Sequence, residues 1–384
     1  MDFLTKMVSY LAKPFDTLAK LFIKKTEWTI TAHDNLTFIN EQLEKMLIFN
    51  CTQTKISIEA EKEKELVSLI KKQTEESNLN NITRTKAYFS FFQRCPEVHW
   101  AFLAHTVSRN GGWNMTDLKG DIIGKILSKK QIEPLFLCFE RANAFIFQDA
   151  YPQLLLYEES KRRGENMFHL LPHFSVSSFM QPFWEDFLLT KNSSLLTVAL
   201  IINEQQHIQK HVIEEPFFQN HVLETLSFLL QQWLGFADVI IPFYAKNKVR
   251  LVGTTVHDFA NVDHRIVIGK TLYGILFYHN KVYNKAYEFA LNTPHTGSRA
   301  DFWPHLFFHT AKMRKNASIY SPKLVNAWPN IKHRYPQQDD WFRDLSMLKH
   351  LHTVPVVKNC DITDNYLTNI IELSSLALSK QLLF

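Results

Sequence analysis

Apolar residues recur at spacings of three and four positions along most of this chain, which is the pattern of helices with one buried face. The start and stop signals are clearest around one such stretch. Pro96 stands where a first-turn proline is typical, and the run from Asn110 to Gly112 favours the left-handed conformation that ends many helices. The pattern therefore predicts a helix from Glu97 to Arg109.

Prolines divide the apolar stretch that follows. A proline disfavours the helical conformation of the residue before it and leaves one helical hydrogen bond unmade. We therefore expect one helix from about Pro134 to Ala150 and a second from Pro152 to Arg163, which Gly164 ends. Helical spacing also predicts a helix over residues 194–215 and a long one from His264 to Ala290.

The predicted helix over residues 194–215 changes character along its length. Its first half contains LLTVALII and is apolar on every side, whereas its second half, NEQQHIQKHVIEE, is polar. A helix that is apolar all round is buried. We therefore expect the first half to lie in the core and the second half to emerge into water.

The stretch from about residue 238 to 255 allows two interpretations. Its two short apolar runs, DVIIPFY and VRLVGTT, fit either helix ends or a small hairpin. The chain of 384 residues has 10 Gly and 14 Pro, which is too few for a turn-rich sandwich or barrel, and its 31 Phe supply a sizeable core. We predict an all-α or predominantly α fold, a multi-helix globular body.

Changes in composition divide the chain into four predicted segments. Residues 55–80 are dense in charge with a thin apolar line, as in a solvated helix or a linker, and the aromatic-rich stretch begins after them. We predict, in chain order, an N-terminal amphipathic helical segment, this charged segment, a main helical domain and a C-terminal helical tail. Their boundaries are residues 1–54, 55–80, 81–350 and 351–384.

Residues 1–25 are both basic and amphipathic. Their apolar positions recur at helical spacing with Lys6, Lys13 and Lys20 between them, and Pro14 breaks the run. Such a helix can lie on an anionic membrane surface, but amphipathic helices more often pack on their own domain. Packing is the preferred interpretation, and peripheral membrane contact through residues 1–25 is the alternative.

The location is predicted from the cysteines and from hydropathy. Cys51, Cys95, Cys138 and Cys360 are far apart and have no zinc-site spacing, which is typical of a reducing compartment. No uninterrupted apolar stretch approaches the ~18 residues of a membrane span. We expect a cytoplasmic protein, with the inner membrane face as the alternative location.

Charge indicates no particular partner. The 43 basic and 38 acidic residues leave a formal charge of +5, and the lysines and arginines are spread along the chain. Nucleic-acid binders usually gather such residues on one face, so we predict no nucleic-acid partner. The sequence does not determine the oligomeric state.

The densest group of polar and aromatic side chains lies between Arg94 and Asp117. One helix needs fewer of them to fold, so we expect some to line a pocket together with polar residues of neighbouring helices. A buried polar network that fixes helix packing explains them equally well. The candidate ligand-binding residues are Arg84, His99, Trp100, His105, Ser108, Arg109, Asn110, Asn114, Glu140 and Asn143.

A second polar stretch runs from His295 to His309, HTGSRADFWPHLFFH. Exposed backbone N–H groups at a helix start with an arginine beside them suit a phosphate or a carboxylate. Helix capping and a structural ion pair are the favoured alternative, because capping explains most Ser and Asp at helix starts. The candidates here are His295, Ser298, Arg299, Asp301 and His305.

Glu204, His207 and His211 form the one recognisable metal-ligand pattern. Their spacings of three and four residues place them on one helical face, and a Glu-x-x-His pair is half of a ferritin-like di-iron pattern. The second pair is missing, because no other glutamate has a histidine three positions later. A polar half-helix without metal is therefore the preferred interpretation, and a metal cofactor remains an alternative that is not predicted.

Catalytic signatures are missing elsewhere in the sequence. The IGKT at Ile268–Thr271 lacks the earlier glycine of a phosphate loop, since that position is His264. There is no GxSxG, HExxH or GxGxxG either. Catalytic residues stay unassigned, and the sequence leaves open whether the protein is an enzyme.

Four long phrases carry a family resemblance. They read NITRTKAYFSFF, EVHWAFLAHTVSRNGGWNMTDLKG, FQDAYPQLLLYE and PHTGSRADFWPHLF. In these phrases, from Asn81 to Leu306, the chain resembles the YppC-like family of bacillar proteins. That family is known as a domain of unknown function, so the resemblance implies a bacterial cytosolic protein and transfers no activity or catalytic residue.

Three hypotheses about function follow. The first is a helical protein that binds a small polar or anionic ligand, or a protein partner, through an aromatic-walled pocket built by the two polar stretches. The second is a metal-dependent enzyme centred on residues 204–215. The third is a scaffold or membrane-surface adaptor that acts through residues 1–25.

Overall fold

The structure is a computed structural model of the chain. It describes residues 26–30, 36–50, 61–223, 238–246, 248–256, 258–314, 318–335 and 339–383. The amphipathic segment predicted for residues 1–25 lies outside these ranges, and the predicted boundaries between the four segments stay a prediction.

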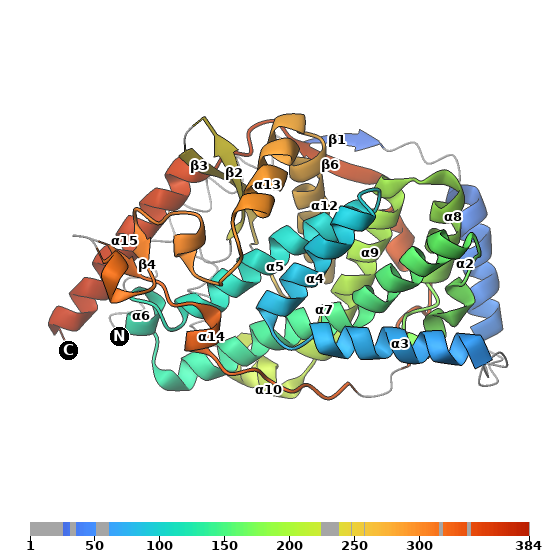
Figure 1. The fold of residues 1–384 in the computed structure, drawn as a ribbon, viewed down its shortest axis with the longest axis horizontal. Coiled ribbons are helices and arrows are strands. Elements are labelled where there is room, and N and C mark those ends of the chain that lie inside the picture. The colour runs from blue at the N-terminus through green and yellow to red at the C-terminus, as the bar shows by residue number, and fades with distance from the viewer. Residues whose placement is uncertain are drawn as a thin grey trace.

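Long helices form the body of the molecule, and the long helix α7 runs through most of its length (Figure 1). Helices α2 and α8 lie at one end of the body, and α15 lies at the other. The fold is predominantly α, as predicted. The longer helices are α2 (Leu36–Asn50), α3 (Glu61–Ser77), α4 (Asn81–Arg94), α5 (His99–Asp117), α7 (Lys129–Arg163), α8 (Met180–Thr190), α9 (Ser193–Ile208), α12 (Val262–Phe277), α13 (Asn280–Asn292) and α15 (Thr363–Leu383).

Short elements connect these helices. Two of them, η2 and η3, are π-helical turns on either side of α10, and η1, η4, η5 and η6 are 3₁₀ turns. In chain order they are α6 (Ile123–Ile126), η1 (Phe168–Phe174), η2 (Gln209–Ile213), α10 (Pro216–Phe218), η3 (Gln219–Leu223), η4 (Arg299–Asp301), η5 (Ala311–Met313), α14 (Leu324–Ala327) and η6 (Ser346–His350).

The strands of the described residues form three two-stranded sheets. Strands β2 (Asp238–Ala245) and β3 (Lys248–Thr255) pair antiparallel, which confirms the hairpin alternative. Strand β1 (Thr26–Ile30) pairs antiparallel with β6 (Thr353–Val357), far away in the sequence. The two-residue strands β4 (Phe307–Phe308) and β5 (Ile319–Tyr320) pair in parallel.

The sequence predicted that this helix ends before the glycine pair, but α5 does not end there. It continues through Gly111 and Gly112 to Asp117, because neither glycine takes a positive φ. The absence of a side chain at Gly112 serves packing instead. A Cβ there would lie 2.3 Å from Oδ1 of Asn81 and 2.5 Å from Nε2 of His295.

Helix α7 is one helix, and the predicted break at Pro152 is wrong. Pro134 and Pro152 both lie inside it. An internal proline costs roughly 3 kcal/mol, but the residues on both sides of Pro152 are buried against the core, and that packing offsets the loss. Its predicted end is confirmed, because Gly164 has φ +72° and its N–H donates to the carbonyl of Ser160.

The helix predicted from His264 to Ala290 is two helices, α12 and α13. The chain turns at Tyr278 and His279, where His279 has an extended backbone and its Nε2 contacts the carbonyl oxygen of Val357 at 2.9 Å. The two shorter helices therefore pack on different neighbours. Helix α12 contacts β6 and α9, whereas α13 contacts β2.

The polar second half of the 194–215 stretch is buried, contrary to the prediction that it emerges into water. His207 and His211 are 8% and 6% exposed. Both side chains have neighbours inside the protein, since Nε2 of His207 lies 3.0 Å from Asp149 of α7 and the His211 ring packs on Phe145. The polar sequence of this segment therefore did not predict its exposure to solvent.

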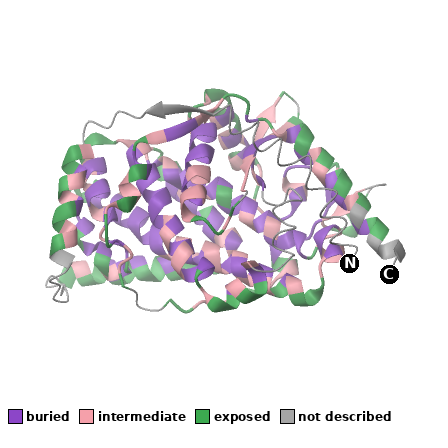
Figure 2. Ribbon diagram, turned by 180° about the vertical axis from the view of Figure 1, so that it is seen from behind, coloured by how far each residue is buried: buried purple, intermediate pink, exposed green. Residues whose placement is uncertain are grey.

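Buried residues fill the interior of the body (Figure 2). The apolar side chains among them form two clusters. The larger includes Trp100, Phe102 and Trp184, and the smaller contains Trp113 and packs under α15. Within the described part of the chain no helix is long and apolar enough to span a membrane.

Candidate functional site

The buried face of α4 is polar in its first half, whereas Ala87, Phe91 and Phe92 make its second half apolar. Asn81, Arg84, Thr85 and Tyr88 are each at most 3% exposed, and Asn78 lies just before the N-terminus of the helix. These five residues recur at helical spacing. They face α5, α7, the loop that contains His295, and residues 330–335. We call them and their direct partners the polar seam.

Asn81 joins the two polar stretches that the sequence singled out. Its Nδ2 donates to the carbonyl oxygen of Ser108 on α5 at 2.8 Å, and its Oδ1 contacts Nε2 of His295 at 2.8 Å. The hydroxyl of Ser108 in turn contacts that of Thr85 at 2.6 Å. The two stretches therefore lie side by side, although they are far apart in the sequence.

Arg109 and His105 lie at this junction and form the first centre. Arg109 is almost without hydrogen-bond partners among the described residues. It is 2% exposed, and its Nη1 donates to the carbonyl oxygen of Thr293 at 2.9 Å. The rings of Phe289 and Trp113 lie 4.9 and 5.7 Å from its guanidinium carbon. Its Nε and Nη2 have no hydrogen-bond partner among the described residues. Burial lowers the pKa of Arg109 to about 10, so it is charged at neutral pH.

His105 precedes Arg109 by one helical turn on the same face of α5. Its Nδ1 contacts the carbonyl oxygen of Thr85 at 2.9 Å, and its ring stacks on Phe89. Nε2 has no partner in the described part of the chain. Burial holds the pKa of His105 well below its ordinary value, and the charge of Arg109 lowers it further.

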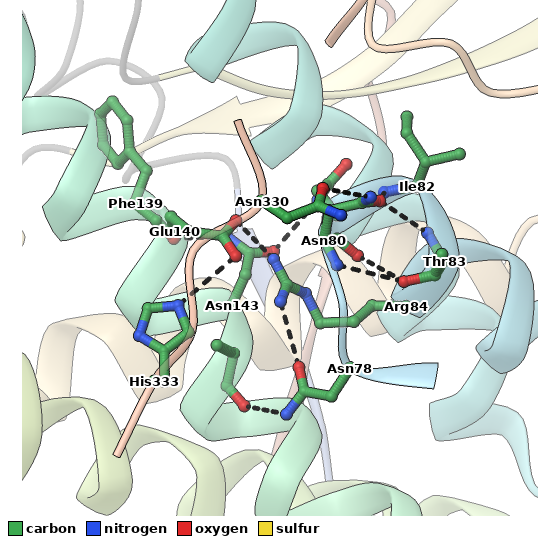
Figure 3. A network of polar contacts seen from close by, with 12 residues as sticks. Asn78, Asn80, Ile82, Thr83, Arg84, Phe139, Glu140, Asn143, Asn330 and His333 are labelled. Atoms are coloured by element: carbon green, nitrogen blue, oxygen red, sulfur yellow. Dashed lines mark hydrogen bonds and ion pairs between the residues drawn. The ribbon is translucent and has the colours of Figure 1, made fainter. Parts of the chain in front are cut away.

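Arg84 and Glu140 form a second centre, on the side of the polar seam towards α7 (Figure 3). Arg84 donates to Glu140 at 2.5 Å and to Oδ1 of Asn78 at 3.0 Å. Nε2 of His333 lies 3.5 Å from the other oxygen of Glu140. Although burial opposes ionisation, Arg84 and His333 hold the pKa of Glu140 below its ordinary value.

Residues 330–335 close this second centre from outside. Asn80 donates to Asn330 at 2.9 Å, and Asn78 donates to the hydroxyl of Tyr335 at 2.9 Å. Asn143 links its own helix to α4, since its Nδ2 donates to the carbonyl oxygen of Phe139 at 2.8 Å and its Oδ1 accepts from Asn81 at 3.4 Å. The second centre is therefore an ion pair enclosed by amide and aromatic groups.

Arg299 and Asp117 form a third centre, near α15. Nε and Nη2 of Arg299 donate to Asp117 at 2.8 and 2.5 Å, Nη1 bonds the hydroxyl of Tyr366, and Nη2 reaches Asn114 at 3.3 Å. Although burial opposes it, the Asp117 carboxylate raises the pKa of Arg299. A small pocket beside the pair is lined in part by Tyr366 and Asn369.

Helix capping and local bonds account for the polar atoms of the loop that leads to Arg299. The hydroxyl of Ser298 accepts from the N–H of Ala300 and donates to the carbonyl oxygen of Ser321. Both oxygens of Asp301 accept from Thr296, at 2.6 and 2.8 Å. Nδ1 of His295 lies 3.6 Å from Asp301.

Four candidates lie outside the three centres. Nδ1 of His99 contacts the hydroxyl of Tyr273, and Oδ1 of Asn110 accepts from the N–H of Ile240. Trp100 is buried and donates to Glu204, whereas His305 is exposed.

The three metal-ligand candidates each have other neighbours. Glu204 accepts from Trp100 and Gln205, at 3.1 and 3.0 Å. His207 faces Asp149, and the rings of His207 and His211 lie 5.9 Å apart. Over the residues that the structure describes, no group of three His, Cys, Asp or Glu side chains could hold a metal ion.

Sequence reasoning missed several members of the polar seam and its surroundings. Asn78, Asn81 and Tyr88 escaped notice because isolated polar residues on a helix are normally solvent-facing. Their helical spacing with Arg84 was the available signal. Asp149 and His333 gave no signal, because only the fold brings them to their partners.

The structure thus defines a predominantly helical protein whose described residues include the polar seam, buried ion pairs and, beside the seam, the nearly unpaired Arg109. The chain belongs to the family described as "Protein of unknown function (DUF2515)", whose family model matches residues 76–366. It is 40% identical over 305 residues to a protein of Bacillus subtilis (strain 168) named "Uncharacterized protein YppC". That match covers 79% of this chain and 92% of the relative and confirms the family resemblance. No solved structure matches the chain.

Proposed function

We propose that this protein binds a small oxyanion at Arg109. The observation that carries the proposal is the state of its guanidinium, which is buried and charged, with Nε and Nη2 unpaired among the described residues. Buried polar groups in folded proteins almost always have a hydrogen-bond partner, which is a protein group, an ordered water or a ligand. An oxyanion supplies acceptors for both N–H groups and neutralises the charge.

The aromatic neighbours of Arg109 do not meet this need. Phe289 and Trp113 contact the guanidinium, but a ring offers no acceptor for N–H groups that lie in the guanidinium plane. The carboxylate of Asp301 favours the charged form of Arg109 from nearby, yet both of its oxygens are already bonded to Thr296. The site therefore combines a buried, charged guanidinium with free donors, which suits an anion.

We place this activity in the cytoplasm. Cys95, Cys138 and Cys360 are buried and unpaired, which suits a reducing compartment. The metal-dependent enzyme has no comparable observation in the residues that the structure describes. The membrane-surface adaptor concerns residues 1–25, which lie outside those residues.

Calorimetric titration with inorganic phosphate and with bicarbonate tests the proposal. We expect saturable binding of at least one of them to the full chain and its loss in Arg109→Met. Arg265→Met is the matched control. Arg265 is also buried and its pKa is lowered to about 10, but its N–H groups are bonded to Gln205, Gln209 and Phe259.

Binding should survive in Arg265→Met to the extent that this variant stays folded, which thermal melting checks. If neither anion binds the folded wild-type chain at millimolar concentration, or if Arg109→Met binds as well as wild type, the proposed function is wrong.

A further inference from the structure

We propose that His105 selects, at the Arg109 site, an oxyanion that still carries an acidic proton, such as hydrogen phosphate or bicarbonate, over one that carries none. This inference rests on the proposed function and names the class of ligand. It follows from the hydrogen-bonding capacity of the two side chains.

The protonation of the His105 ring is fixed by its partner. Nδ1 lies 2.9 Å from the carbonyl oxygen of Thr85, and a carbonyl oxygen can only accept. Nδ1 therefore carries the ring proton. In the neutral imidazole Nε2 then has a lone pair and no hydrogen, so it needs a donor from its surroundings.

The surroundings keep His105 neutral. Arg109 follows it by one turn on α5, His295 comes from the loop before η4, and the α4 side presents the Thr85 carbonyl and the Phe89 ring. Burial and these two basic neighbours hold the pKa of His105 well below its ordinary value. Asp301 is the acidic group near this cluster, and Thr296 occupies both of its oxygens.

The site thus offers two donors from Arg109 and one acceptor from His105, on one face of α5. A hydrogen oxyanion matches this set, because its charged oxygens accept from Nε and Nη2 of Arg109 while its O–H donates to Nε2 of His105. Sulfate and nitrate carry no proton at neutral pH. Either would place an oxygen lone pair against that of Nε2, and a buried acceptor left without a donor lowers affinity.

Two pairs of probes isolate the proton from size and shape. Bicarbonate and nitrate are both planar and singly charged, and phosphate and sulfate are both tetrahedral. We expect wild-type protein at neutral pH to bind the proton-bearing member of at least one pair about tenfold more tightly or better, measured by calorimetric titration.

His105→Phe removes the acceptor and keeps a ring to stack on Phe89 and Phe102, which lie 4.7 and 6.0 Å from the His105 ring. The preference should vanish in this variant while Arg109 still binds an anion. His105→Gln is a second variant in case His105→Phe fails to fold. Its amide can present either a donor or an acceptor, so it should bind both members of a pair with similar affinity.

The outcomes separate the two proposals. Equal binding of both members of each pair by wild type, still dependent on Arg109, would overturn the selection by His105 and leave the oxyanion site standing. A preference that persists unchanged in both His105 variants would do the same. Absence of any binding that depends on Arg109 would overturn the proposed function and this inference together.

Discussion

Single buried ionisable residues show how the fold sets charge in this protein. Glu204 is partly buried between α9 and α5 and accepts from Trp100 and Gln205. Burial raises its pKa to about 8, and the negative charge of Asp149 contributes. The carboxyl is therefore largely protonated at neutral pH, unlike Glu140, whose arginine partner keeps it ionised.

Glu204→Gln should make the folding stability less dependent on pH. In wild type the unfolded chain ionises Glu204 above its ordinary pKa of 4.5, whereas the folded chain does so only near 8. The contribution of Glu204 to the free energy of unfolding therefore falls as the pH rises between these two values, by up to about 1.4 kcal/mol per pH unit. Glutamine cannot ionise. The free energy of unfolding of Glu204→Gln, measured by urea denaturation from pH 5 to 8, should therefore change less with pH than that of wild type.

Glu165→Gln is the control for this prediction, because Glu165 is exposed at the end of α7. The free energy of unfolding of this variant should change with pH as steeply as that of wild type. Equal slopes for Glu204→Gln and wild type would show that Glu204 is ionised in the folded protein.

At the scale of the element, helix α5 shows what sequence patterns can and cannot predict. Its apolar spacing predicted the helix, and Trp100 and Phe102 lie in the core as such spacing implies. Its end was predicted wrongly, because glycine allows two interpretations: a left-handed turn or a close contact. Only the position of Asn81 and His295, on other elements, decides between them.

Gly112→Ala should lower the free energy of unfolding by about 1–3 kcal/mol, since Asn81 and His295 must move away from the new Cβ.

Gly111→Ala is the neighbouring control. Its Cβ would lie 3.0 Å from Nδ2 of Asn143, a side chain end that can give way, and alanine favours the helix by up to about 1 kcal/mol. We therefore expect Gly111→Ala to be near neutral in chemical denaturation. Similar losses in both variants would mean that helix geometry, not the contact with Asn81, limits position 112.

For the whole molecule, the fold class and the family could be predicted from the sequence, while the polar seam could not. The pairing of the Arg94–Asp117 and His295–His309 stretches was proposed from their composition, and the structure places them side by side. Which atoms remain unpaired depends on contacts between distant segments. Arg84, for example, meets Glu140 of α7 and, through Glu140, His333 from a segment much later in the chain.

The Arg84–Glu140 pair should therefore act as one unit that holds α4, α7 and residues 330–335 together. Arg84→Met leaves Glu140 buried with the imidazole of His333, 3.5 Å away, in place of a salt bridge to arginine, which should cost roughly 3–5 kcal/mol of folding free energy. The double variant Arg84→Met, Glu140→Leu removes both charges from the interior. Replacing a buried ion pair with apolar groups of similar volume is often neutral, so the double variant should be more stable than Arg84→Met alone.

Urea unfolding of wild type, both single variants and the double variant completes this cycle. A positive coupling between the two positions, with stability recovered in the double variant, would show that the pair specifies how the three parts assemble and adds little to net stability. If the losses simply add, the two side chains stabilise the fold independently. The amide groups of Asn78 and Asn80, not the ion pair, would then be what holds residues 330–335 against α4.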